Sequence, residues 1–405
     1  MIDEPLREVV RQRAQSLAAF LTTTRRDIHA RPELGNQEQR TAALVVDVLK
    51  ELGLELHESV GGTGVVAVLR GATAGPTLAL RADMDALPLD EEGDRPYRSS
   101  TPGVMHACGH DGHVAMALGA ARVLHGLRER LHANVKFLFQ PAEETYGGAS
   151  EMLAAGCLTQ EPRVDAVFGI HLEPMDAVGA LCLKRGPIMA SADALRVVVK
   201  GMGGHASAPH DCIDPVAVAA HVITNLQTLV TRRFDARSPV VITITYVQAG
   251  TAFNVIPPEV VLAGTVRTVE AKVRAEMPAR IEELVQHTVA AFGATAEVAY
   301  VQGSGVVVNH PTFTDFVRDV VRAARGHDAV VEMADPVMGA EDFGLYLEQV
   351  PGAFAFVGAR PSHQDAYPCH HPRFDIDEHA LPIGVEILST VALEYLGSPR
   401  ESATT

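Results

Sequence analysis

Short apolar runs alternate with longer amphipathic segments along the first 190 residues of the chain. Four apolar runs bounded by Gly, Pro or charged residues predict strands, at residues 63–71, 77–87, 134–141 and 164–174. Apolar residues at helical spacing predict helices over 113–131 and 148–156. Because strand–helix alternation is typical of βαβ units, we predict an α/β fold with a mostly parallel central sheet.

The pattern changes near residue 190. Four segments predict strands, at residues 193–201, 239–250, 259–268 and 295–303, and the second and third of them alternate apolar with polar residues. Helices are predicted over 214–233, where Asp214 and Pro215 form a typical helix start, and over 270–293. The order β-α-β-β-α-β is that of a ferredoxin-like unit.

The α/β alternation then resumes with a helix from Thr312, a strand over 352–359 and a last helix from about Asp377. The ferredoxin-like unit therefore interrupts a larger domain. We predict a discontinuous domain formed by residues 1–188 and 306–405, with an inserted domain at 189–305. Clefts form at domain interfaces and beyond the carboxyl ends of parallel strands.

Composition narrows the class of protein. The 405 residues are 47% hydrophobic and 21% charged, which is an ordinary globular balance. A net charge of −16 disfavours nucleic acid or an anionic membrane as a partner. Five scattered cysteines suggest free thiols in a reducing compartment. With neither a secretory signal nor a run of 18 apolar residues, the sequence predicts a soluble cytoplasmic protein.

Residues that can bind metals cluster where predicted strands end. The nine residues 105–113, "MHACGHDGH", hold a cysteine, three histidines and an aspartate. Further clusters follow other strands or lie in a late loop: Asp83 and Asp85, Glu143 and Glu144, His171, and His370 and His371. One such residue is more often structural, but a folded core does not need five clusters at sheet edges. Together they predict a metal site.

Several motifs resemble those of one known family. "LRADMDALP", "MHACGHDGH", "FQPAEE", "GGHASAPH", "NVIP" and "GTVRT" are similar to motifs of the dinuclear metallohydrolases related to aminoacylase. Within that family the chain resembles the branch of hippurate hydrolases, N-acyl-amino-acid amidohydrolases and auxin–amino acid conjugate hydrolases. The resemblance implies a zinc-peptidase-like catalytic domain, formed by 1–188 and 306–405, and an inserted lid and dimerisation domain.

The resemblance also implies a set of catalytic residues. Glu143 would be the general base that takes a proton from a metal-bound water to give the attacking hydroxide. Asp85 would orient a ligating imidazole that the sequence does not identify. The implied ligands of two divalent ions are Cys108, His110, Glu144, His171 and His370. Thiolate and imidazole favour zinc, with manganese, cobalt or nickel as alternatives. The roles of Asp83, His371, Glu341 and Asp342 stay open.

The inserted domain would contribute to the same site. By resemblance, His205 reaches the active site of a neighbouring subunit and stabilises a tetrahedral oxyanion. Asn254 and Arg267 resemble contacts to the carboxylate of the substrate, and a planar guanidinium can bind such a group bidentately. These roles imply a homodimer, with a higher homo-oligomer also possible.

The sequence therefore predicts a metal-dependent amidohydrolase that cleaves N-acyl-L-amino acids, with N-acetyl or hippurate-like acyl groups. A dipeptidase, a carboxypeptidase or an N-carbamoyl amino acid hydrolase of the same superfamily is the enzymatic alternative. A metal- or ligand-binding homologue without turnover is the non-enzymatic one. A serine hydrolase and a P-loop nucleotide enzyme are disfavoured, because G-x-S-x-G and G-x-x-x-x-G-K-[ST] are absent from the sequence.

Overall fold

The computed structural model describes residues 2–145, 147–362 and 364–397, which form two compact units. Unit 1 contains residues 1–186, 308–335 and 342–405, and unit 2 contains 187–307 and 336–341. The domain limits expected from the sequence, 189 and 305, lie two residues inside those of the main segment of unit 2. The short segment 336–341 was expected in the larger domain, but it packs with unit 2, where the Val337 amide donates to the Ile188 carbonyl.

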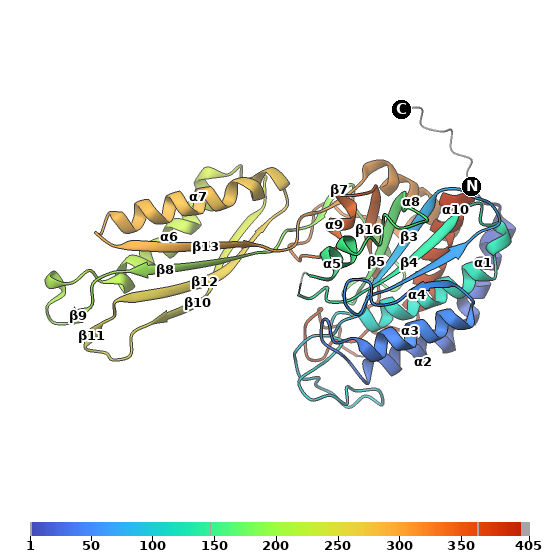
Figure 1. Ribbon diagram of the computed structural model, residues 1–405, viewed down its shortest axis with the longest axis horizontal. Coiled ribbons are helices and arrows are strands. Elements are labelled where there is room, and N and C mark those ends of the chain that lie inside the picture. The colour runs from blue at the N-terminus through green and yellow to red at the C-terminus, as the bar shows by residue number, and fades with distance from the viewer. Residues whose placement is uncertain (1, 146, 363, 398–405) are drawn as a thin grey trace. The chain divides into compact units, whose positions relative to one another are not determined.

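Unit 1 is built on an eight-stranded sheet (Figure 1). Its strands, in spatial order, are β1 (Glu55–His57), β2 (Val65–Arg70), β4 (Asn134–Gln140), β3 (Thr77–Asp83), β5 (Ala166–Glu173), β16 (Gly352–Gly358), β6 (Leu181–Leu183) and β15 (Val330–Glu332). The four central strands, β4, β3, β5 and β16, are parallel to one another. Almost all of their residues are buried, as expected of a parallel sheet covered by helices.

The helices of unit 1 are α1 (Glu4–Ser16), α2 (Ala18–His29), α3 (Gln39–Glu51), α4 (His110–His125), α5 (Gly148–Ala154), α8 (Pro311–Arg325), α9 (Gly344–Leu347) and α10 (Ala380–Gly397). Helix α4 lies against β3 and β5 and is itself covered by α2 and α10. Small residues allow this close packing: a Cβ on Gly112 would lie 2.5 Å from a methyl group of Leu172. The close approach fixes the first turn of α4 beside the end of β5.

Unit 2 is a four-stranded antiparallel sheet with two helices, α6 (Pro215–Arg233) and α7 (Ala271–Ala290). Its strands, in spatial order, are β10 (Val240–Ala249), β12 (Glu259–Thr268), β8 (Asp193–Lys200) and β13 (Thr295–Gln302). This is the predicted ferredoxin-like topology. The Asp214 carboxylate caps α6 by accepting from the Val216 amide. Beyond one end of the sheet, β9 (Gly204–His205) pairs with β11 (Val255–Ile256).

The structure differs from the sequence-based expectation at element ends, in short elements, and before residue 63, where the helices α1, α2 and α3 were not predicted. The strand expected over 77–87 ends at Asp83, and the helix expected from 113 begins at His110. The last helix begins at Ala380. Short elements that hydrophobic periodicity does not reveal include β1, β6, β15, β7 (Gly186–Met189), β14 (Val307–Asn309) and the 3₁₀ turns η1 (Arg128–Arg130), η2 (Pro209–Asp211) and η3 (His327–Ala329). Within the described ranges, the helices are too short or too polar to cross a membrane.

Candidate metal centre

The predicted metal ligands of unit 1 meet beyond the carboxyl ends of its central strands. In the parallel register, Asp83 of β3 lies opposite Gln140 of β4, so Glu143 and Glu144 follow at the same edge. His171 lies near the carboxyl end of β5, and His110 is the first residue of α4. The parallel sheet therefore brings together residues that are far apart in the sequence.

The donor atoms form overlapping groups in which every pair lies within 4.8 Å. Those groups are Cys108 with His110 and His171, Cys108 with Glu144 and His370, and His110 with Glu143 and Glu144. The Cys108 sulfur is 3.4 Å from Nε2 of His171, and Nε2 of His370 is 3.3 Å from Oε1 of Glu144. All five residues expected as ligands are therefore neighbours, and Cys108 belongs to two of the groups.

Two buried donor atoms in this cluster show that the residues fit a metal. Nε2 of His110 and Oε1 of Glu144 are shielded from solvent and make no hydrogen bond with any described residue. The two atoms lie 4.0 Å apart, a separation that suits two ligands of one ion better than a direct bond. A buried polar atom without a hydrogen bond is costly, and the contact of Oε1 of Glu144 with His370 at 3.3 Å is not a hydrogen bond. A bound cation would satisfy both.

Asp85 holds the His110 ring in place. Oδ1 of Asp85 lies 3.3 Å from Nδ1 of His110, and the Asp85 backbone carbonyl lies 2.9 Å from the same nitrogen. Oδ2 of Asp85 accepts from the backbone amide of Glu144 at 3.0 Å. One carboxylate thus connects two of the expected ligands and leaves Nε2 of His110 facing the cluster. This identifies the imidazole that the sequence left open.

Asp83 performs a similar task for a second histidine. Its Oδ1 lies 2.6 Å from Nδ1 of His113, whose Nε2 accepts from the backbone amide of Leu172 at 2.8 Å. Leu172 directly follows His171, so His113 fixes the end of β5 on which that donor sits. Asp83 itself lies 3.7 Å from His110. Both residues thus position the expected ligands, although Asp83, His110 and His113 could also form a donor group of their own.

A buried polar network behind Asp83 was not recognised in the sequence. Nη2 of Arg81 donates to Asp342 at 3.1 Å, and its Nε donates to Gln140 at 2.8 Å. Asp342 also accepts from Gln140 and, at 2.9 Å, from the Ala149 amide in the first turn of α5. These contacts tie the ends of β3 and β4 to the segment that follows Glu144. Asp342 is among the residues whose roles the sequence alone leaves open.

Backbone strain occurs at two places beside the donors. Ala142 and His370 are among the few non-glycine residues with positive φ, at 52° and 68°. Such conformations persist where surrounding contacts fix them, and they are frequent at functional sites. The Ala142 amide donates to Glu38 at 2.8 Å, and the His370 amide donates to the Ala107 carbonyl at 2.7 Å. These hydrogen bonds therefore fix the backbone of the turns that carry Glu143 and His370.

The structure also distinguishes His370 from its neighbour. The ring of His371 stacks on Tyr367 with centroids 4.4 Å apart, and its Nδ1 accepts from the Arg373 amide at 3.0 Å. His370 instead lies against Cys108 and Glu144. Of the two histidines, only His370 is placed to act as a ligand.

The charges of the cluster favour bound cations. Burial opposes protonation of His110, but Asp83, Asp85 and Glu144 together raise its pKa well above the usual value. Although burial acts to raise the pKa of Asp83, the charges of Arg81, His110 and His113 hold it well below normal. Burial, together with His113, lowers the pKa of His171. Anionic carboxylates and a neutral imidazole are the forms that bind metal, and the field that favours a proton on His110 favours a metal ion there as well.

The three predicted residues of unit 2 do not form one cluster within that unit. His205 on β9 pairs with Val255, and the Ala206 amide donates to the Asn254 carbonyl at 3.1 Å, so His205 and Asn254 are neighbours. Arg267 is near the end of β12, opposite Val241 of β10. It lies eight residues along the strand from Glu259, which at about 3.3 Å per residue is roughly 26 Å. Arg267 and the His205–Asn254 pair therefore occupy opposite ends of the sheet.

An α/β sheet whose edge carries a cluster of Cys, His and Glu donors is typical of a metal-dependent hydrolase. Comparison with known proteins agrees. The model of peptidase family M20/M25/M40 matches residues 79–394, and the chain belongs to this family. It is therefore a hydrolase of amide bonds that uses two divalent metal ions.

Relatives match nearly the whole chain. The N-acetyl-L-cysteine deacetylase of Bacillus subtilis is 40% identical over 389 residues, covering 96% of this chain and 91% of the relative. Thermostable carboxypeptidase 2 of Saccharolobus solfataricus is 38% identical, and the match covers 96% of this chain and 98% of the relative. A solved dinuclear metal-binding peptidase of the M20 family from Bacillus subtilis has a TM-score of 0.82 and 36% identity, covering 95% of this chain and 99% of its own. The predicted family, fold class and enzyme class are confirmed.

Replacing Asp85 by Asn should weaken metal binding about 10- to 100-fold, the usual effect of losing a partner that orients a ligand. The amide cannot accept from the Glu144 backbone with its nitrogen, and it removes one negative charge beside His110. Affinity is measured by competition with a chelator. The exposed Asp94→Asn is the matched control and should bind metal like the wild type. An Asp85→Asn protein with unchanged affinity would contradict the positioning role.

Proposed function

We propose that this enzyme hydrolyses the amide bond of N-acyl-L-amino acids, with N-acetyl or hippurate-like acyl groups, to a carboxylic acid and a free amino acid. The observation that carries the proposal is the cluster of Cys108, His110, Glu144, His171 and His370 with the buried carboxylate of Glu143 beside it. The name of the Bacillus deacetylase gives additional support. Free cysteines in the described chain are consistent with a cytoplasmic location.

Zinc is the proposed physiological metal, and manganese, cobalt or nickel are the alternatives. A thiolate and three imidazoles suit zinc better than magnesium or calcium, while the carboxylates also accept harder ions. When bound, two divalent ions polarise an amide carbonyl and make a water molecule more acidic.

Glu143 is the proposed general base. Its carboxylate lies within 4.8 Å of the donor atoms of His110 and Glu144, and its side chain is 5% exposed. It would take a proton from the attacking water and deliver it to the leaving nitrogen, which must be protonated to depart as an amine. Glu144 is held by Asp85 and is placed for metal binding instead. Adjacent glutamates thus divide two tasks.

His205 is proposed to donate a hydrogen bond to the oxyanion that forms during the reaction. Its Nδ1 accepts from the backbone amide of Ser207 at 3.1 Å, and the Ser207 hydroxyl lies 2.7 Å from the same nitrogen. An acceptor at Nδ1 places the proton of the neutral ring on Nε2. His205 therefore presents an N–H donor from an exposed position, which is what an oxyanion requires.

A homodimer follows if Asn254 and Arg267 bind the same substrate. The two residues lie at opposite ends of the unit 2 sheet, and β12 alone rises roughly 26 Å between Glu259 and Arg267. An N-acyl amino acid is far shorter than that. One copy would supply Arg267, and a second copy would supply His205 and Asn254, so a complete site requires two subunits.

Replacing Arg267 by Met should raise KM for N-acyl amino acids about 30-fold or more, because the substrate carboxylate loses its cationic partner. The KM for the corresponding C-terminal amides, which lack that charge, should rise much less. Steady-state kinetics on acid and amide pairs measure the difference. Arg196→Met, which removes an exposed arginine from the neighbouring strand β8, is the control. Equal effects on acids and amides would contradict the assignment.

The proposed function is tested by amino-acid release from N-acetyl, N-benzoyl and N-indoleacetyl amino acids and from dipeptides. Each substrate is assayed with the protein as purified, after chelation, and after adding back zinc, manganese, cobalt or nickel. Release from N-acyl amino acids that stops on chelation and returns with metal is the expected result. Absence of release from every N-acyl substrate by fully metallated protein would overturn the proposal.

A dipeptidase or carboxypeptidase is the second candidate, favoured by the relative named thermostable carboxypeptidase 2. A peptide bond is itself an amide that two metal ions could polarise, so the acyl side of the pocket would decide between the two substrate classes. Faster release from dipeptides than from any N-acyl amino acid would favour this candidate. Bound metal without any turnover would favour a binding protein.

A further inference from the structure

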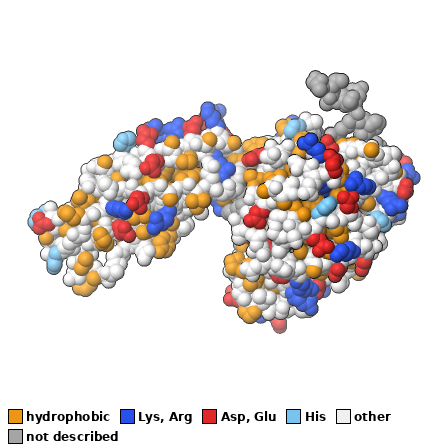
Figure 2. Space-filling model, in the orientation of Figure 1, with side chains coloured by type: hydrophobic (Ala, Val, Ile, Leu, Met, Phe, Trp, Pro, Cys, Tyr) orange, Lys and Arg blue, Asp and Glu red, His pale blue; other side chains and the backbone are white. Residues whose placement is uncertain are grey.

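An exposed phenylalanine lies beside His205 and Asn254. Phe253 is 101% exposed, in the connection between β10 and β11. The next residue, Asn254, is fixed through its carbonyl by the Ala206 amide, and Val255 pairs with His205. Figure 2 shows hydrophobic side chains, in orange, at the end of unit 2 that carries β9 and β11.

The Phe253 ring contributes nothing to packing within its own chain. The connection is held by backbone bonds, including the Val255 amide donating to the Ala252 carbonyl at 3.3 Å. Apolar exposure continues nearby, with Tyr246 50% and Val247 59% exposed on β10. A fully exposed aromatic ring on a structured loop is typical of a residue that meets a ligand or another chain.

We propose that Phe253 covers the acyl group of a substrate bound at the metal centre of a second copy of this chain. This inference rests on the proposed function, in which His205 and Asn254 act on that second copy. Because Phe253 adjoins Asn254, it reaches the same place. The carboxylate of the substrate needs polar partners, so the acyl group is the part that an apolar ring can cover. Phe253 would therefore favour aromatic and longer aliphatic acyl groups over acetyl.

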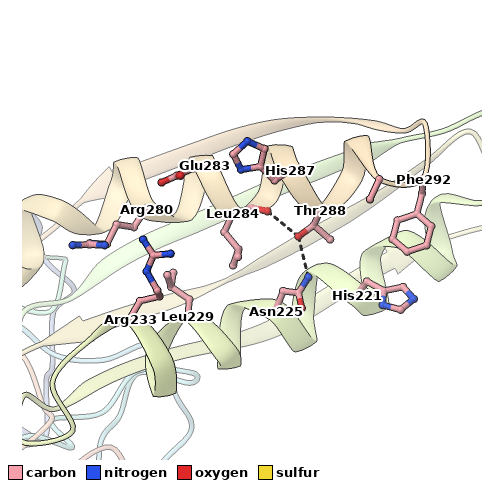
Figure 3. Close-up of a pocket in the computed structure, with 11 residues that line it drawn as sticks. His221, Asn225, Leu229, Arg233, Arg280, Glu283, Leu284, His287, Thr288 and Phe292 are labelled. Atoms are coloured by element: carbon pink, nitrogen blue, oxygen red, sulfur yellow. Dashed lines mark hydrogen bonds between the residues drawn. The ribbon is translucent and has the colours of Figure 1, made fainter.

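The first test compares kcat/KM for N-benzoyl and N-acetyl derivatives of one amino acid. Phe253→Ala should lower the benzoyl-to-acetyl ratio about 10-fold or more, mainly through KM, and Phe253→Leu should recover part of the loss. The matched control is Phe292→Ala. Phe292 is the other exposed phenylalanine of unit 2, and it stacks on His221 beside the groove between α6 and α7 (Figure 3). Its loss should not change the ratio.

An unchanged benzoyl-to-acetyl ratio in Phe253→Ala would overturn the inference. If kcat/KM also fell equally for both substrates, the ring would make a contact between subunits only. Either result can be read only if the wild type hydrolyses both substrates. Failure of the wild type itself to hydrolyse them would instead count against the proposed function.

A mixed dimer tests whether the ring acts across the subunit boundary. One differently tagged subunit carries Glu143→Gln, which leaves its own centre inactive but its Phe253 intact. The other carries Phe253→Ala and an intact centre. If Phe253 acts on the second copy, the purified mixed dimer should show the benzoyl-to-acetyl ratio of the wild type. The lower ratio of the Phe253→Ala homodimer would show that the ring serves its own chain and would overturn the proposal.

Discussion

Replacing Glu143 by Gln should lower kcat about 10²- to 10⁴-fold while both metal ions remain bound. The magnitude is that of losing a general base, and the amide keeps the size of the side chain but cannot accept a proton. Because the five expected ligands are untouched, the metal content measured by elemental analysis should stay at two per subunit. Single-turnover kinetics would locate the defect in the chemical step.

The neighbouring Glu144→Gln variant is the control that separates the two glutamates. Glu144 shares donor groups with Cys108, His110 and His370, so its loss should release metal, and added metal should restore part of the activity. Metal loss in Glu143→Gln, with activity recovered on adding metal, would mean that the two roles are exchanged.

The second large effect is expected for Cys108→Ser. Cys108 lies in two donor groups, so its loss should weaken the binding of both ions. The loss of affinity should exceed the 10- to 100-fold that is typical of losing a partner that orients a ligand. A hydroxyl is also a poor ligand for zinc, so any remaining activity should shift towards manganese. Metal titration of the chelated protein, followed by activity with each ion, measures both effects.

Cys182→Ser is the matched control, because Cys182 is a buried thiol of unit 1 whose sulfur contacts Asp176 at 3.2 Å, outside the donor groups. It should keep two ions and the metal preference of the wild type. A Cys108→Ser protein that binds zinc with normal affinity would contradict the ligand assignment.

Much of this structure could be predicted from local sequence. The buried strands β3, β4 and β5 are continuous apolar runs, and α6 begins where Asp214 and Pro215 indicate. Their alternation gives the parallel sheet, and the sheet edge then brings the metal donors together. The family motifs added what spacing cannot provide, such as the choice of His370 over His371.

Other features depend on contacts between distant segments, which a single sequence does not reveal. The pairing of Asp85 with His110, and of Asp342 with Arg81 and Gln140, arises only when separate strand ends meet. Short strands such as β6 and β15 form because a neighbouring strand offers hydrogen bonds, not because their own periodicity is strong.

The arrangement of Asn254 and Arg267 is a second example. Both residues resemble contacts to one carboxylate, yet the register of β12 places them at opposite ends of a sheet. Only the folded unit shows this separation. If both residues bind one substrate, as proposed, strand geometry rather than either motif is the reason to expect a second subunit.

Amide hydrolysis by this enzyme is expected to require a pair of metal ions held by unit 1. The most direct test titrates zinc into chelated protein while the release of amino acid from an N-acetyl substrate is followed in the same solution. Binding should saturate at two ions per subunit, with release rising as the ions bind and stopping again on chelation. Full release from protein stripped of both ions would contradict the claim, as would a protein with two bound ions that releases nothing from any N-acyl amino acid or dipeptide.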